Sequence, residues 1–135
     1  MRIVLDTNVI VSAILTPGGT CVEVMGRVFA KTAQVIVSPA IEEEYAAVLG
    51  RAELGLDAVN VARHIEFIRQ HGILLPTIDT GIVVPRPTDK KFIECAIAGR
   101  ADCIVTGNNR HFPASACKGI PIMSPAEFIE AIKGT

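Results

Sequence analysis

The sequence contains no tryptophan, one tyrosine and only five phenylalanines in 135 residues. Because 50% of the residues are hydrophobic, the core must consist mainly of aliphatic side chains. No apolar run approaches the ~20 residues that a membrane-spanning helix needs. Only Arg2 precedes the first apolar stretch, which Asp6 interrupts, so the pattern of a secretory signal peptide is missing. We therefore expect a soluble cytoplasmic protein without a membrane partner.

Cysteine pairs with metal-binding or redox spacing are also missing. Four cysteines (Cys21, Cys95, Cys103 and Cys117) form no C-x-x-C pair and no zinc-like cluster with the histidines. They are expected to be reduced thiols. The formal net charge is −1, so binding of nucleic acid would require a local basic patch. Neither a G-x-x-x-x-G-K-[ST] loop nor a G-x-G-x-x-G loop is present.

Short apolar runs alternate with segments of helical periodicity. Strands are predicted at 2–5, 34–37, 103–105 and 120–123, with an extended piece at 73–75 that 82–84 could continue. Helices are predicted at 8–15, 20–32, 39–50, 57–71, 88–99 and 125–133. This alternation indicates an α/β fold, with a parallel sheet covered on both faces. The length is that of a single domain, residues 1–135.

The first predicted strand ends at an acidic residue. The apolar run 3–5 is followed by Asp6, Thr7 and Asn8. In open parallel sheets the ligand crevice lies beyond the carboxyl ends of the strands, so Asp6 could begin a metal or phosphate site. Alternatively, Asp6 or Asn8 caps the following helix. This segment alone supports the two interpretations equally.

The helix predicted at 39–50 offers a second carboxylate. At about 100° per residue, its apolar stripe contains Ile41, Tyr45, Val48 and Leu49. Glu43 points away from this stripe and is expected to be solvated. Glu44 lies at one edge of the stripe and Glu42 at the other, so either could join Asp6 at the end of the sheet. An ordinary surface position is the alternative for both.

The helix predicted at 88–99 offers a third carboxylate. Its buried stripe contains Phe92, Ile93, Ala96 and Ile97, and Lys90, Lys91 and Glu94 are predicted to face outward. Asp89 falls within the angular range of the buried stripe. The helix N-terminus would stabilise its charge, but an inward-facing charge is costly unless it is paired or binds a metal. A capping or dipole role is the alternative.

The loop after strand 103–105 completes the set of candidates. It reads Thr106-Gly107-Asn108-Asn109-Arg110-His111 and follows the same end of the sheet as Asp6. The asparagine amides could hold a water or a metal ligand, although such residues are more often plain turn formers. Two aspartates and a glutamate together would suit Mg²⁺ or Mn²⁺, ions that support phosphodiester hydrolysis.

Four motifs in this order resemble the PIN domain family. They are Leu5-Asp6-Thr7-Asn8-Val9; Ser38-Pro39 with Glu43-Glu44-Tyr45 and Val48-Leu49; Asp89 with Phe92-Ile93-Glu94-Cys95-Ala96; and Ala101-Asp102 with Ile104-Val105-Thr106-Gly107. The similarity runs from residue 2 to Phe128. It is greatest to the branch of toxin components of toxin–antitoxin systems, related to VapC-type toxins.

The resemblance implies a three-layer α/β/α fold with a central parallel sheet, and a Mg²⁺- or Mn²⁺-dependent endoribonuclease. The family's acidic positions fall on Asp6, Glu44, Asp89 and Asn108. The first three would ligate the metal, and Asn108 would orient a ligand or a water. The partners would be an RNA substrate, a small antitoxin that covers the site, and a second copy in a homodimer.

Other residues near these positions are candidates for binding the RNA phosphates. Thr7, Asn8 and Thr106 would position the reacting phosphate. Four basic residues could grip neighbouring phosphates: Lys90, Lys91, Arg110 and His111. For the two lysines, solvated surface charge is the alternative.

Two departures from the family pattern affect the functional prediction. The acid-rich D-x-D-D stretch reads Arg86-Pro87-Thr88-Asp89-Lys90, and Asn108 replaces the aspartate after Thr-Gly. Fewer carboxylates should weaken metal binding, so one ion is expected rather than two. One alternative is therefore a catalytically weakened PIN domain that binds RNA or protein. A receiver-like or phosphatase domain is less well supported, because it needs paired acids where Asp6 stands alone.

Overall fold

Five short parallel strands form the centre of the computed structural model, which describes residues 1–134. They are β1 (Arg2–Leu5), β2 (Gln34–Val37), β3 (Ile73–Leu74), β4 (Cys103–Val105) and β5 (Ile122–Met123). Their order in the sheet is β3-β2-β1-β4-β5. The predicted strands 2–5, 34–37 and 103–105 are confirmed, the last strand is shorter than expected, and 82–84 forms no strand.

The strand order places a topological switch point beside β1. The chain moves outward from β1 to β2 and β3, and then returns to the other side of β1 to form β4 and β5. Register pairs Arg2 with Gln34 on one side of β1, and Leu5 with Val105 on the other. Such a switch point is where ligand crevices form in open parallel sheets, so a binding site is expected at the carboxyl ends of β1 and β4.

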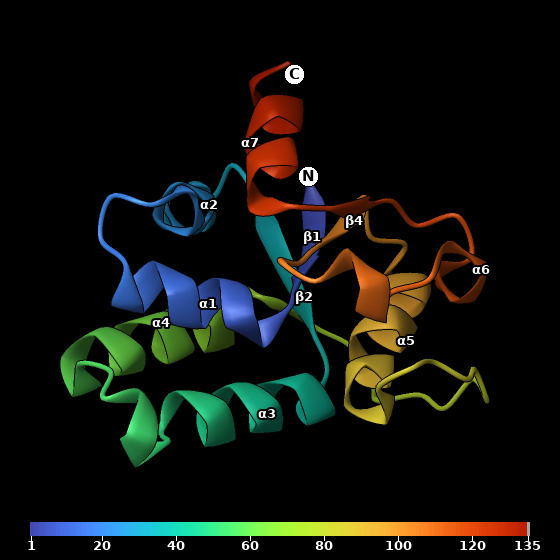
Figure 1. Cartoon of the computed structure of the whole chain (residues 1–135), viewed down its shortest axis with the longest axis horizontal. Helices are drawn as coiled ribbons and strands as arrows, with labels where there is room; N and C mark the ends of the chain where they lie inside the picture. The colour runs from blue at the N-terminus through green and yellow to red at the C-terminus, as the bar shows by residue number, and fades with distance from the viewer. Residues whose placement is uncertain (135) are drawn as a thin grey trace.

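Seven α-helices connect and flank these strands within residues 1–134 (Figure 1). They are α1 (Thr7–Leu15), α2 (Thr20–Phe29), α3 (Pro39–Leu49), α4 (Ala58–His71), α5 (Lys90–Gly99), α6 (Ala114–Cys117) and α7 (Pro125–Lys133). Single 3₁₀ turns occur at Ala52–Leu54, Pro87–Asp89 and Asn109–His111. Helix α2 ends three residues before its predicted end, because Lys31 adopts a left-handed backbone conformation (φ 64°) in the turn leading to β2.

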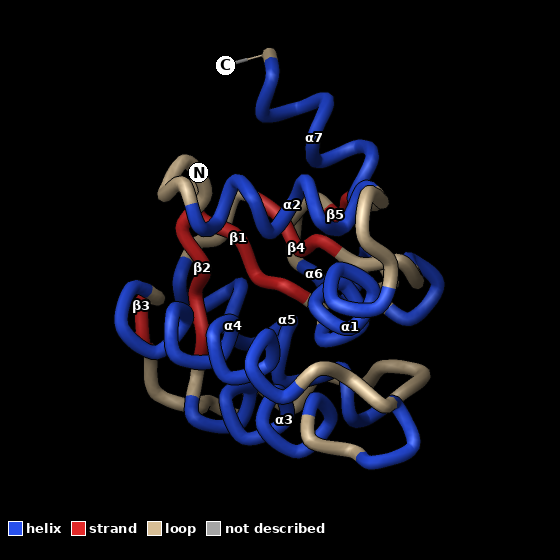
Figure 2. The backbone as a smooth tube through the Cα atoms, turned by 90° about the vertical axis from the view of Figure 1, so that its left-hand side faces the viewer, coloured by secondary structure: helices blue, strands red, loops and turns tan. Residues whose placement is uncertain are grey.

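Helices cover both faces of the sheet. Helix α5 packs across β1, β2 and β4 on one face. Helices α1 and α2 pack on each other on the opposite side of β1 and β2, and α7 packs against α2 (Figures 1 and 2). The expected three-layer α/β/α architecture with a central parallel sheet is therefore confirmed.

Local signals in the sequence account for the positions of α3 and α7. The Ser38 side chain accepts a hydrogen bond from the Ile41 N–H at 3.4 Å, and Pro39 stands in the first turn, where its missing N–H has no cost. Ser124 and Glu127 form a reciprocal capping box at α7, which satisfies two backbone donors at the helix start.

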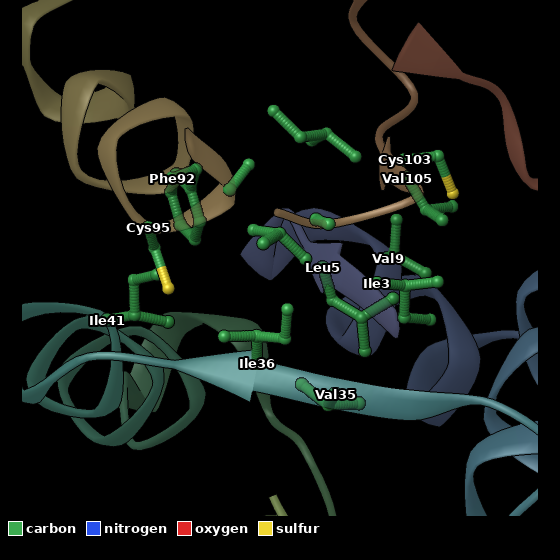
Figure 3. Close-up of a cluster of buried hydrophobic side chains, with 14 of the residues drawn as sticks. Ile3, Leu5, Val9, Val35, Ile36, Ile41, Phe92, Cys95, Cys103 and Val105 are labelled. Atoms are coloured by element: carbon green, nitrogen blue, oxygen red, sulfur yellow. The ribbon is translucent and has the colours of Figure 1, made fainter. Parts of the chain in front are cut away.

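The core is aliphatic, as the composition predicts. Leu5 of β1, Ile36 of β2 and Phe92 of α5 point into one cluster between the sheet and the helices (Figure 3). Each is fully buried, which stabilises the fold by about 1.5–3 kcal/mol per side chain. This packing fixes the strands and helices whose ends carry the acidic residues.

The outward position predicted for Glu94 is wrong. Glu94 is only 6% exposed, because the segment between β3 and α5 folds over this side of the helix. The Thr80 backbone N–H and its hydroxyl both donate to Oε2 of Glu94, the hydroxyl at 3.0 Å. A buried carboxylate needs such donors, so Glu94 anchors this segment.

Among residues 1–134, no single helix has the length and apolarity to cross a membrane; α1 and α2 reach both only together, as a pair bent by 107°.

Candidate active site

The acidic residues predicted from the sequence meet at the carboxyl end of β1. The Asp6 backbone N–H donates to the Val105 carbonyl at 3.0 Å, which extends the β1–β4 pairing to the first residue beyond the strand. The N-termini of α1, α3 and α5 converge on this end of the sheet (Figure 1). Glu44 lies in the second turn of α3, and Asp89 directly precedes α5.

Asp6 is a buried carboxylate held by the neighbouring strand. It is 6% exposed, and Oδ2 accepts a 2.7 Å hydrogen bond from the Thr106 hydroxyl. Burial raises the pKa of Asp6, the Thr106 hydrogen bond opposes this rise, and the charge of Glu44 adds to it. The Asn8 N–H also lowers this pKa, yet in the described chain the Asp6 side chain makes no capping hydrogen bond to α1. Asp6 therefore occupies the N-cap position of α1, and the hydrogen bond that holds its carboxylate comes from Thr106.

Glu44 is the glutamate of α3 that belongs to this group. It is half-buried, and its charge raises the pKa of both Asp6 and Asp89. Oε2 accepts a short hydrogen bond from the Thr7 hydroxyl, and Oε1 pairs with the Lys91 ammonium of α5 at 2.5 Å. Glu43 is exposed, as its helical phase predicts.

Asp89 carries a buried oxygen without a hydrogen-bond partner. The residue is 6% exposed, and its Oδ2 is the single buried side-chain N or O atom of residues 1–134 that makes no hydrogen bond. Burial raises the pKa of Asp89, and the negative charge of Asp6 raises it further. Leaving a buried oxygen unpaired costs about 1–3 kcal/mol, so this atom is available to a ligand that supplies positive charge.

A group of basic side chains surrounds these carboxylates: Arg86, Lys91 and His111. Arg86 Nε and His111 Nδ1 each lie 3.8 Å from Asp89 Oδ2. Arg86 Nη1 lies 3.3 Å from His111 Nδ1. A guanidinium can only donate, so Arg86 is the donor of any hydrogen bond in this contact. The positive charges of Arg86 and His111 both oppose the rise in the pKa of Asp89 that burial causes.

Arg86 is not among the site residues predicted from the sequence. Arg86 stands in the position of a missing acid, which is the signal that could have revealed it. Lys90 pairs with Asp79 at 2.7 Å in the segment before α5, and Arg110 is exposed. Within residues 1–134, neither Lys90 nor Arg110 makes a hydrogen bond or ion pair with the carboxylates of the site.

The remaining candidates differ in their surroundings. Thr7 and Thr106 are buried, and each donates its hydroxyl to a carboxylate of the site. Asn8 and Asn108 are exposed. The Asn108 backbone N–H donates to the Thr106 hydroxyl oxygen at 3.0 Å, so the structure connects Asn108 to the site through its backbone.

The donor set fits a hard divalent cation, although the ligand geometry is not preformed. No group of three histidine, cysteine, aspartate or glutamate side chains within residues 1–134 is already arranged to hold a metal. Three carboxylates nevertheless lie close enough to perturb one another, and one has an unpartnered oxygen. Oxygen donors of this kind suit Mg²⁺ or Mn²⁺.

Comparison with known proteins shows the family and the fold of the chain. The family model described as the PIN domain matches residues 2–110. Among solved structures, the chain is similar to VapBC2 from Rickettsia felis bound to a DNA fragment from its promoter, with a TM-score of 0.60 and 16% identity. That alignment covers 92% of this chain and 98% of the other and shows a shared fold. No curated protein matches the chain. The chain belongs to the PIN domain family.

Proposed function

We propose that this PIN domain is a divalent-metal-dependent endoribonuclease that hydrolyses RNA phosphodiesters. The observation that carries the proposal is the meeting of two buried aspartates, Asp6 and Asp89, with Glu44 at one end of the sheet. Burial raises the pKa of both aspartates; the charge of Glu44 raises both further, and that of Asp6 raises the pKa of Asp89. The unpartnered Oδ2 of Asp89 adds to this observation. A dication bound between the carboxylates would lower their pKa values and give the unpartnered oxygen a ligand.

Asp6, Glu44 and Asp89 would hold Mg²⁺ or Mn²⁺. The bound ion supplies Lewis acidity, which lowers the pKa of a water and neutralises charge on the phosphate. The chain's own contribution is orientation. Thr106 holds Oδ2 of Asp6, and Thr7 holds Glu44 beside it.

The basic side chains would bind the RNA phosphates. Arg86 and His111 lie beside Asp89, so a phosphate at the metal would lie near a guanidinium, which can donate two parallel hydrogen bonds to it. Thr7, Asn8 and Thr106 would help to position the reacting phosphate, and Asn108 would orient a ligand or a water. Lys90 and Arg110 would bind RNA phosphates farther from the metal position.

The partners expected of such a protein are also proposals. We propose that it acts in the cytoplasm as the toxin of a toxin–antitoxin pair and forms a homodimer. The support is the shared fold with VapBC2 of Rickettsia felis. Sedimentation of the purified chain, alone and with a co-expressed small neighbour protein, measures both assemblies. A chain that remains a monomer in both samples would contradict them.

The activity is tested by incubating single-stranded and structured RNA with Mn²⁺ and the purified protein. Wild type should cleave, and Asp6→Asn should lose at least about 100-fold of the rate, because it removes a charged ligand of the ion. Glu43→Gln removes an exposed carboxylate from the same helix as Glu44 and should cleave like wild type. Equal cleavage by wild type and Asp6→Asn would show that the site is assigned wrongly.

A second candidate function is a weakened PIN domain that binds RNA or a protein without cutting. The observations in its favour are the exposed Asn108 in place of an acid and the engagement of Glu44 by Lys91. The same assay separates the two candidates: retention of RNA in a gel-shift experiment without cleavage at any Mn²⁺ concentration favours the binding module.

A further inference from the structure

Lys91 is the one basic side chain of the group that contacts Glu44 directly. Its ammonium lies 2.5 Å from Oε1 of Glu44, with the two side chains 23% and 19% exposed. The same ammonium lies 5.8 Å above the centre of the Phe92 ring. Since Thr7 donates to the other oxygen, both oxygens of Glu44 already have donors within the protein.

The three carboxylates are therefore not equivalent. Glu44 has an ammonium 2.5 Å from one of its oxygens, whereas Asp6 is held by the uncharged Thr106 hydroxyl. The guanidinium nearest to Asp89, that of Arg86, is 3.8 Å away, and Oδ2 of Asp89 makes no hydrogen bond. A dication at the two aspartates would therefore lack Glu44 as a ligand, because Glu44 is paired with the Lys91 ammonium. This agrees with the lack of a preformed group of three ligands among the described residues.

We propose that Lys91 is a positioning residue that holds Glu44 away from the metal position in the ion-free protein and competes with the divalent cation for that carboxylate. This inference rests on the proposed function, because it assumes a metal at Asp6, Glu44 and Asp89. It adds that the metal must replace the Lys91 ammonium at Glu44, and that this exchange sets the affinity for the metal. Glu44 becomes a ligand only after its ion pair with Lys91 breaks.

The size of the effect follows from charge and distance. Even at the dielectric constant of water, a unit positive charge within about 6 Å of a dication opposes its binding by about tenfold. Partial burial of the Lys91–Glu44 pair increases that figure, because screening by solvent is reduced. Lys90 is the matched control, since it carries the same charge one residue earlier but pairs with the exposed Asp79.

The test is a Mn²⁺ titration followed by the electron paramagnetic resonance signal of the free ion. Lys91→Met keeps an unbranched apolar stem without the ammonium and should bind Mn²⁺ about tenfold more tightly than wild type. Lys90→Met should stay within about twofold of wild type, and Lys91→Arg should restore the wild-type affinity. Thermal unfolding confirms that each variant is folded, and Lys91→Gln replaces Lys91→Met if that variant is not.

Unchanged or weaker Mn²⁺ binding by a folded Lys91→Met or Lys91→Gln variant would overturn the inference. The proposed function would still stand in that case, provided that wild type binds Mn²⁺. If neither wild type nor the variants bind Mn²⁺ at millimolar concentration, the proposed function fails together with the inference. An equal gain in Lys90→Met would also overturn it, because the effect would then be one of net charge rather than competition for Glu44.

Discussion

The Thr106 hydroxyl and the Asp6 carboxylate, 100 positions apart in the chain, share a 2.7 Å hydrogen bond at the ends of adjacent strands. The bond connects the carboxyl end of β4 to that of β1, at the topological switch point of the sheet. It also orients Asp6 and opposes the rise in its pKa that burial causes.

Thr106→Val should weaken Mn²⁺ binding and RNA cleavage by about 10- to 100-fold, the usual effect of removing a hydrogen bond that orients a metal ligand. Valine keeps the shape of threonine, so the fold should be retained. Thr106→Ser keeps the hydroxyl and serves as the control. If the valine variant matched wild type in a calorimetric titration, Thr106 would have no role in orienting Asp6.

Tyr45→Phe should destabilise the fold by about 1–2 kcal/mol. The Tyr45 hydroxyl donates to the Leu5 carbonyl at 2.6 Å, immediately before Asp6. Burial raises the pKa of Tyr45 well above its usual value, so the group remains protonated and can only act as donor toward a carbonyl. Urea denaturation measures the change, and a loss below about 0.5 kcal/mol would contradict this role.

Protonation of His64 should destabilise the protein in mild acid. His64 is buried against Phe29, and its Nδ1 contacts the Asn60 carbonyl at 2.8 Å. Burial lowers the pKa of His64, with the nearby Arg63 acting in the same direction and the Asn60 contact opposing it. The unfolded chain therefore binds the proton more readily, so this contribution to stability is complete above about pH 6.5 and falls as the pH drops below it.

Urea denaturation between pH 5 and pH 8 measures this dependence. His64→Gln removes the titrating group, so its free energy of unfolding should decline less steeply than that of wild type below about pH 6.5. Parallel profiles for the two proteins would show that His64 does not contribute.

Gly99→Ala should destabilise the fold although alanine is the better helix former. A methyl group at Gly99 would lie 2.8 Å from Leu75 Cδ1 and 2.9 Å from Ile36 Cδ1. Such overpacking costs about 1–3 kcal/mol. Gly26, in α2, is the matched control, because a methyl group there would meet nothing within 4 Å, and Gly26→Ala should stabilise by about 0.5–1 kcal/mol. Thermal unfolding compares the two, and equal midpoints would contradict the account.

Much of the fold follows from local signals in the sequence. The strand 34–37, the Ser38 cap and the last helix 125–133 all occur where the pattern predicts them. Helical phase also placed Asp89 inward and Glu43 outward, as observed. These features depend on residues that lie within one or two helical turns of each other, so they can be read from the local sequence.

Features that depend on distant contacts could not be predicted in the same way. Helical phase predicts the direction of Glu94 relative to the face of α5 that packs on the sheet. It does not predict that the segment containing Thr80 covers the other side of this helix. Likewise, Lys90 and Lys91 are indistinguishable as charges in sequence. Only the structure shows that one pairs with Asp79 and the other with Glu44.

The central claim is that Asp6, Glu44 and Asp89 bind one divalent ion, and calorimetric titration with Mn²⁺ tests it most directly. Wild type and Glu43→Gln should bind one ion with the same affinity. Glu44→Gln and Asp89→Asn should each bind at least about tenfold more weakly, because each removes a negative charge beside the dication. Absence of binding by wild type at millimolar Mn²⁺, or equal affinity in all four proteins, would contradict the claim.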